Sequence, residues 1–285
     1  MRKIHACGLV ALGVLISAPF CCGGPTGPNV FGYVAAPSNA PFQDISSSGT
    51  RVLAGTDDAS ALANIGFTFS PLDPQYSYAS VWISSNGLLS FTCPNSNPSN
   101  VDLATPGLGP VIAPLWYDWQ FVAPANGAVY YQTTGSPGDR QFTVEWKNAY
   151  THNFLAQQPV SFEATFFESS GNILFSYANT GTGDYSTAYG ASATVGVAGT
   201  DAGEDVEWSF DQGIVGPYTS ILFDSQPGSI GVLTGYNLPA GDPVLPEPRS
   251  LVLLWTGLGM LLAGKRRFMV QMLRRGAKER SAKIL

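Results

Sequence analysis

Short runs of alternating apolar and polar residues fill the middle of this chain and predict β-strands. In residues 141–147, Phe142, Val144 and Trp146 occupy every second position, with polar residues between them, and residues 160–168 repeat the pattern. Successive side chains of a strand point to opposite faces of a sheet. The pattern therefore predicts two strands, each with one face buried in a core and a polar face turned to solvent.

Further short apolar runs, separated by turn-forming residues, predict more strands. They cover residues 65–69, 81–85, 88–91, 111–118, 128–133, 173–177, 193–197, 206–210 and 220–223. No long run between Gly32 and Gly241 has the 3.6-residue period of a helix. A parallel sheet would need a helix or other long crossover after each strand. The sequence thus predicts an all-β fold, an antiparallel β-sandwich.

Two local signals refine this strand pattern. Asn86-Gly87 lies between two apolar runs and predicts a hairpin with a two-residue type I′ turn, because both positions of that turn need positive φ. Pro114 lies inside the apolar run 111–118. Proline cannot donate a ladder hydrogen bond, so Pro114 predicts a sheet edge, a bulge or the start of a strand.

The N-terminus has the pattern of a secretory signal peptide, predicted over residues 1–24. Arg2 and Lys3 form a positive start, and residues 8–16 are an apolar core of suitable length. The prediction places the domain that follows it outside the cytoplasm.

The cysteines argue against an internal disulfide in the mature chain. Cys7 lies in the predicted signal, and Cys21 and Cys22 lie at its edge, which leaves Cys93. The Cys21-Cys22 pair raises the alternative of a lipoprotein. The preceding residues 18–20 (Ala-Pro-Phe) do not fit a lipobox, so the ordinary secretory signal is favoured.

The C-terminal part has three consecutive features. They are the motif Pro246, Glu247 and Pro248, an uncharged apolar run over residues 250–264, and the basic cluster Lys265, Arg266 and Arg267. This order resembles the PEP-CTERM sorting signal of exported proteins in Gram-negative bacteria. The resemblance implies a single transmembrane helix that holds the protein in the inner membrane until an exosortase cuts near the motif.

The apolar run of 15 residues is about 22 Å long as a helix, against about 30 Å of hydrocarbon. It is short for a permanent span, although a permanent anchor with a cytoplasmic tail stays open as an alternative. The prediction divides the chain into a signal peptide (1–24), an ectodomain (25–235), a linker (236–245), the sorting signal (246–267) and a basic cytoplasmic tail (268–285).

Charge is distributed unevenly along the chain. Between Gly23 and Pro248 there are three basic residues against 19 acidic ones, whereas the remaining basic residues lie at the two ends. An acidic body disfavours binding to nucleic acid and to anionic lipid head groups. Basic ends fit the cytoplasmic flanks of membrane segments.

Five sequence blocks resemble the extracellular domain named after nidogen. They are residues 112–118 (IAPLWYD), 127–131 (GAVYY), 142–148 (FTVEWKN), 173–177 (ILFSY) and 193–197 (ATVGV). Similar bacterial surface proteins often carry an Ile-Ser-Ser-Asn-Gly hairpin before these blocks, as at residues 83–87. The resemblance covers roughly residues 65–210 and implies a β-sandwich used in adhesion or matrix contact. It brings no catalytic residues.

Candidate enzyme chemistry is sparse in the predicted ectodomain. Its one histidine, His152, has no nucleophile signature beside it and is expected to be a solvated loop residue. A zinc site built from several histidines or cysteines is lacking. The best enzyme hypothesis is a glycan hydrolase that uses Asp118 and Glu145 as paired carboxylates. Glu145, however, belongs to the polar face of a strand, where charge is expected anyway.

Two binding features complete the sequence predictions. An acidic group is a candidate calcium site, because hard cations take several oxygen ligands from loops; its residues are Asp201, Glu204, Asp205, Glu207 and Asp211. No other cofactor is predicted. Tyr185 and Tyr189 in a Gly/Thr-rich loop are candidate platforms for sugar rings.

Together these observations predict an exported, non-enzymatic protein of the cell surface or extracellular matrix. Its expected partners are the exosortase, the membrane through the C-terminal helix, and an extracellular polysaccharide or a matrix or surface protein. The alternatives are a secreted glycan-active hydrolase and a permanently anchored structural protein.

Overall fold

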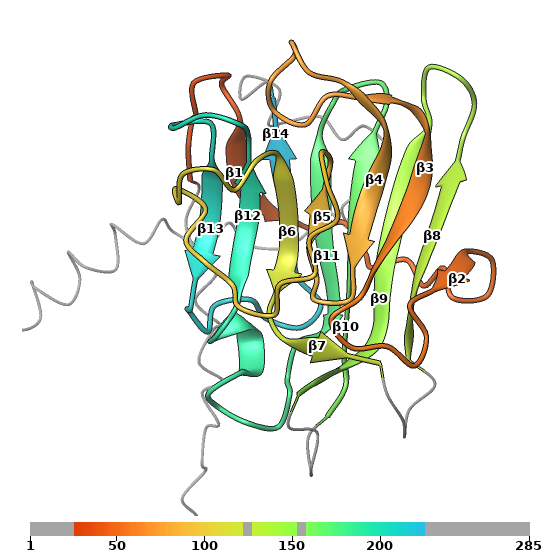
Figure 1. Cartoon of the computed structure of the whole chain (residues 1–285), viewed down its shortest axis with the longest axis vertical. Helices are drawn as coiled ribbons and strands as arrows, with labels where there is room; N and C mark the ends of the chain where they lie inside the picture. Colours follow the sequence, from red (N-terminus) through yellow and green to blue (C-terminus); the bar gives the residue numbers. More distant parts are fainter. Residues whose placement is uncertain (1–25, 122–126, 153–157, 226–285) are drawn as a thin grey trace, which may run out of the picture. The chain divides into compact units, whose positions relative to one another are not determined.

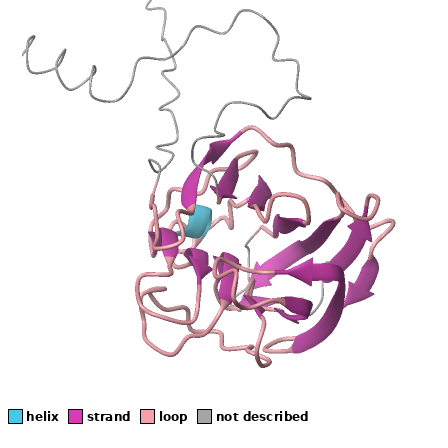
Figure 2. Ribbon diagram, turned by 90° about the horizontal axis from the view of Figure 1, so that it is seen from above, coloured by secondary structure: helices cyan, strands magenta, loops and turns pink. Residues whose placement is uncertain are grey.

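The computed structural model describes residues 26–121, 127–152 and 158–225, and these form two antiparallel sheets that face each other (Figures 1 and 2). The predicted all-β, antiparallel sandwich is confirmed for this part of the chain. The predicted signal peptide, the linker and the whole sorting tail lie outside the described residues. Among the described residues, no helix is long and apolar enough to cross a membrane.

The first sheet has eight strands. In spatial order they are β1 (Val34–Ser38), β14 (Ser220–Asp224), β11 (Ile173–Asn179), β10 (Val160–Phe167), β9 (Gln141–Thr151), β8 (Ala128–Thr134) and β2 (Thr50–Val52), with the short β7 (Trp119–Gln120) also paired to β9. The sequence prediction missed β1, β2 and β7. The strands β2 and β7 have only three and two residues, and β1 (Val-Ala-Ala-Pro-Ser) has small residues and a proline in place of alternating apolar and polar side chains.

The second sheet has six strands. In spatial order they are β13 (Val206–Phe210), β12 (Thr194–Ala198), β6 (Val111–Trp116), β5 (Leu89–Ser90), β4 (Tyr78–Ser84) and β3 (Ser60–Phe69). A single turn of 3-10 helix, η1 (Ala188–Gly190), lies between β11 and β12. One sheet lies in front of the other in Figure 1, and β6 contacts β10 and β3 contacts β8 between the two sheets.

Aromatic side chains from both sheets fill the core between them. Trp146 of β9 is fully buried and stacks on Phe162 of β10, with 5.1 Å between ring centroids. Its indole N–H donates to the carbonyl of Ser84 in β4 across the sandwich at 2.8 Å. Phe69 of β3 likewise stacks on Phe166 of β10 at 4.6 Å. The predicted burial of Trp146 between the sheets is confirmed.

The outer face of the first sheet is covered, contrary to the prediction of a solvated polar face. Glu145 and its cross-strand neighbour Glu163 are 0% and 1% exposed. The N–H groups of Ile45 and Gln43 donate to these carboxylates at 2.9 and 3.1 Å, respectively. The segment 41–49 thus lies over the strands β9 and β10. Alternation shows which residues share a face, but it cannot show that a distant segment covers that face.

The Asn86-Gly87 hairpin is present but is not the predicted type I′ turn. Ile83 pairs with Leu89, and three residues (85–87) form the loop between the paired positions 84 and 88. Gly87 has φ +72°, whereas Asn86 does not have positive φ. This is the pattern of a three-residue loop that ends in a left-handed glycine. Asn86 is fully buried, which a solvent-exposed two-residue turn would not allow.

Replacing Gly87 with alanine should destabilise the fold by roughly 2–4 kcal/mol in urea unfolding, because it adds strain at positive φ to a backbone clash. A Cβ atom at this position would overlap the carbonyl of Leu115. Gly107→Ala is the matched control: Gly107 also has positive φ (+80°), but nothing lies within 4 Å of its added Cβ. Equal losses for the two variants would show that the Leu115 contact is unimportant.

Pro114 lies in β6, at the centre of the second sheet, at a break in the strand pairing. The register between β6 and β12 shifts between Ala113 and Trp116. The carbonyl of Pro114 accepts a hydrogen bond from the buried Tyr177 hydroxyl at 2.7 Å. Of the three predicted options (edge, bulge or strand start), the bulge is confirmed.

Candidate functional site

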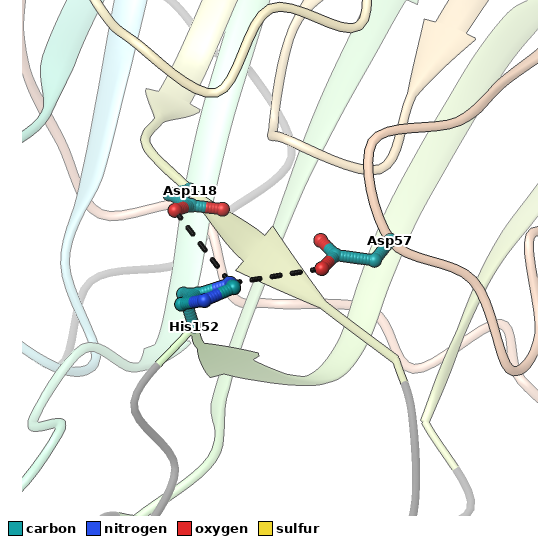
Figure 3. A group of neighbouring side chains, drawn as sticks. All are labelled: Asp57, Asp118 and His152. Carbon is teal, nitrogen blue, oxygen red and sulfur yellow. Dashed lines mark ion pairs between the residues drawn. The ribbon is translucent and has the colours of Figure 1, made fainter.

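Three side chains from distant parts of the sequence meet beside strand β7 (Figure 3). Asp57 comes from the turn between β2 and β3, Asp118 from the link between β6 and β7, and His152 directly follows β9. One candidate ligand atom from each residue lies within 4.8 Å of the other two. We refer to these residues as the Asp57–Asp118–His152 cluster.

Backbone pairing fixes His152 against Asp118. The strands β7 and β9 pair with Trp119 opposite Thr151, and the next residue, His152, donates its backbone N–H to the carbonyl of Asp118 at 3.2 Å. The buried side-chain amide of Gln120 donates to the carbonyl of His152 at 2.7 Å. The end of β9 is therefore held in place by β7.

Asn86 connects the two segments that carry the aspartates of the cluster, by hydrogen bonds to residues next to them. Its amide group donates to a carboxylate oxygen of Asp58 at 2.8 Å, and its side-chain oxygen accepts from the N–H of Trp119 at 3.0 Å. The backbone carbonyl of Asn86 accepts a hydrogen bond from the N–H of Tyr117 at 3.1 Å. One buried side chain thus ties the turn that carries Asp57 to the link that carries Asp118.

The cluster faces solvent and is rich in negative charge. The Nδ1 atom of His152 lies 3.7 Å from Oδ2 of Asp57 and 4.0 Å from Oδ2 of Asp118. Partial burial raises the pKa of Asp118; the nearby His152 lowers it, and the carboxylates of Asp57 and Asp58 raise it further. The His152 side chain is 69% exposed. Such an arrangement can hold a cation between its nitrogen and oxygen donors.

The two carboxylates of the hydrolase hypothesis lie in different surroundings. Asp118 is half-exposed beside His152. Glu145 is fully buried under the segment that contains Ile45. Asp118 precedes Trp119, which pairs with Thr151 of β9, and Glu145 lies six residues before Thr151 on that strand. Six strand residues span roughly 20 Å, whereas paired catalytic carboxylates lie about 5–10 Å apart. The geometry gives this pair no support.

Three of the five carboxylates predicted to bind calcium, those of Glu204, Glu207 and Asp211, accept hydrogen bonds within the protein. One oxygen of Glu204 accepts the N–H groups of Thr200 and Asp201 at 2.6 and 2.9 Å. Glu207 accepts the N–H of Leu103 at 2.9 Å. In addition, Asp211 accepts from the side chain of Asn100, while Asp201 is exposed and Asp205 half-exposed. Across the described ranges, these residues do not form a three-ligand group. Calcium binding there stays a prediction.

Other sequence-predicted residues have mixed outcomes. Tyr185 is 94% exposed, as a sugar platform requires, whereas Tyr189 is half-buried in the same loop. The sorting residues 246–248 and 265–267 lie outside the described part of the chain. No sequence pattern points to Asp57, and His152 was predicted to be only a solvated loop residue. Only the folded chain brings Asp57, Asp118 and His152 together.

Residues 32–219 match the family model described as NIDO related. The chain belongs to the NIDO-related family. The match spans the sandwich from the start of β1 to the residue before β14, so it includes the whole Asp57–Asp118–His152 cluster and the buried Asn86. A NIDO-related sandwich is consistent with an extracellular or cell-surface location. No curated protein and no solved structure matches the chain.

Proposed function

We propose that this NIDO-related chain is a non-enzymatic surface or matrix protein, exported by its N-terminal signal and sorted by an exosortase through its C-terminal tail. The observation that carries the proposal is the NIDO-related sandwich over residues 32–219, followed by the Pro-Glu-Pro motif, the apolar run and the basic cluster. In this proposal the sandwich is the extracellular domain, and the tail is the sorting signal.

The character of the described domain supports a binding role. Its acidic residues are mostly committed to hydrogen bonds or ion pairs, such as Glu168 with Arg140 and Asp44 with Lys147. The exposed ring of Tyr185 remains available to a partner. Aromatic rings contribute large contact areas in binding sites at low entropic cost. The expected ligand is an extracellular polysaccharide or a surface protein that this loop contacts.

Tyr185→Ala should weaken binding to the native surface polysaccharide or matrix by about five- to tenfold, because truncating a central tyrosine of a binding site commonly costs more than 1 kcal/mol. Binding of the purified protein to isolated cell-surface material measures the effect. The control is Tyr76→Ala, since Tyr76 is another exposed tyrosine at 47%. If both variants weaken binding equally, or neither does, Tyr185 is not part of the binding surface.

The sorting step can be tested with two epitope tags, one before Leu245 and one after Leu285. The proposal predicts that the two tags separate, with the first outside the cell and the second retained or degraded. Glu247→Ala should keep the tags on one membrane-bound species, while Asp139→Ala, a change of an exposed acidic residue outside the motif, should not. A permanent anchor instead predicts one full-length membrane species in every variant.

A further inference from the structure

We propose that Asp57, Asp118 and His152 form a binding site for a divalent transition-metal ion such as Zn²⁺. The proposal concerns a ligand of the sandwich itself and does not depend on how the chain is sorted. The three donors come from three segments that the fold brings together beside β7 (Figure 3).

The spacing of the donor atoms is close to that of a metal site. Zinc ligands lie about 2.0–2.2 Å from the ion, so neighbouring ligand atoms of a tetrahedral site are about 3.4 Å apart. The Nδ1 atom of His152 is 3.7 Å from the Asp57 oxygen and 4.0 Å from the Asp118 oxygen. All three donor atoms lie within 4.8 Å of one another, so binding would draw them somewhat closer around one ion.

The donor types select the class of ion. One imidazole nitrogen and two carboxylate oxygens suit zinc and similar borderline ions, whereas calcium and magnesium favour sites made of oxygen alone. Three protein ligands leave a fourth position to water or to a ligand atom from a partner. The 69% exposed side chain of His152 places that position at the surface.

The surroundings also favour a cation. The carboxylates of Asp57 and Asp118 both face the imidazole of His152, whose Nδ1 atom lies within 4.0 Å of an oxygen of each. The adjacent carboxylate of Asp58 is bonded by the amide of Asn86. A bound cation would offset the repulsion between the carboxylates of Asp57 and Asp118. The buried network of Asn86 and Gln120 holds the segments in place before the ion arrives.

Calorimetric titration of the metal-free full chain, purified in mild detergent, with ZnCl₂ tests the proposal. It predicts one ion per chain. His152→Ala, Asp118→Asn and Asp57→Asn should each weaken binding at least about tenfold, since each removes one of three ligands. Asp139→Asn is the matched control: it makes the same charge change at an exposed acid outside the cluster and should leave affinity unchanged. Unchanged melting temperatures of the metal-free variants would show that they remain folded.

Loading with Co²⁺ identifies the donor atoms independently. The visible absorption should be that of a site with nitrogen and oxygen ligands, without a thiolate charge-transfer band, and should be lost in His152→Ala. Binding that survives His152→Ala, or a thiolate band that disappears with Cys93→Ser, would place the ion elsewhere and overturn the proposal. Absence of binding would also overturn it and would leave His152 as an ion-pair partner of the two aspartates. Either result leaves the tag experiment on sorting unaffected.

Discussion

Replacing Trp146 with alanine should lower the free energy of unfolding by about 3–5 kcal/mol, the usual range for large-to-small aromatic changes in a core. The side chain is fully buried and stacks on Phe162, so its removal leaves a cavity between the sheets. The change also leaves the carbonyl of Ser84 without its indole donor. Urea unfolding followed by circular dichroism measures the loss.

The control for this prediction is Trp82→Ala. Trp82 lies on β4 in the opposite sheet and is only half-buried. Its truncation removes less apolar surface from the core, and we expect a loss of roughly 1–2 kcal/mol or less. Similar losses for the two variants would contradict the assignment of Trp146 to the centre of the sandwich.

Stability should fall as pH rises from 5 to 9 because of the buried pair Glu145 and Glu163. Desolvation is the main cause that raises their pKa values from 4.5 to about 7 and about 8. A carboxyl whose pKa is higher in the folded state stabilises the fold when protonated. That contribution is complete below about pH 4.5 and is lost as pH rises through 7 and 8. The loss is on the order of a few kcal/mol.

Glu163→Gln isolates this effect, because glutamine stays neutral and keeps an oxygen that can accept from the N–H of Gln43. The variant should gain stability relative to the native chain between pH 5 and pH 9. Glu168→Gln is the control: the ion pair with Arg140 holds the pKa of Glu168 at about 2, so its effect should not vary above pH 5. A Glu163→Gln difference that is constant from pH 5 to 9 would contradict a raised pKa in this pair.

The sequence predicted those parts of the fold in which local pattern and burial agree. The alternation in β9 and β10 identified the core positions of Trp146 and Phe162 correctly. It misassigned Glu145 to solvent, because the segment 41–49 that covers this residue is about 100 positions away in the chain. The turn at Asn86 was misjudged for a related reason: its side chain bonds to Asp58 and Trp119, which no local signal reveals.

The candidate site was beyond sequence reasoning for the same physical cause. The sequence singled out Asp118 only as a candidate catalytic carboxylate and His152 only as the one histidine of the ectodomain, and nothing in the sequence connects either residue to Asp57. The connection arises from the pairing of β7 with β9 and from the buried amide of Asn86. The sorting tail is the opposite case. Its evidence is the order of residues 246–267 alone, so its test must come from the exported protein.

The intact mass of the protein recovered from outside the cell tests the proposed function most directly. Export and sorting predict a chain that begins near residue 24 and ends near the Pro246–Pro248 motif, without the apolar run or the basic tail. A species that retains residues 250–285 and remains in the membrane fraction would contradict exosortase sorting and would establish a permanent anchor instead.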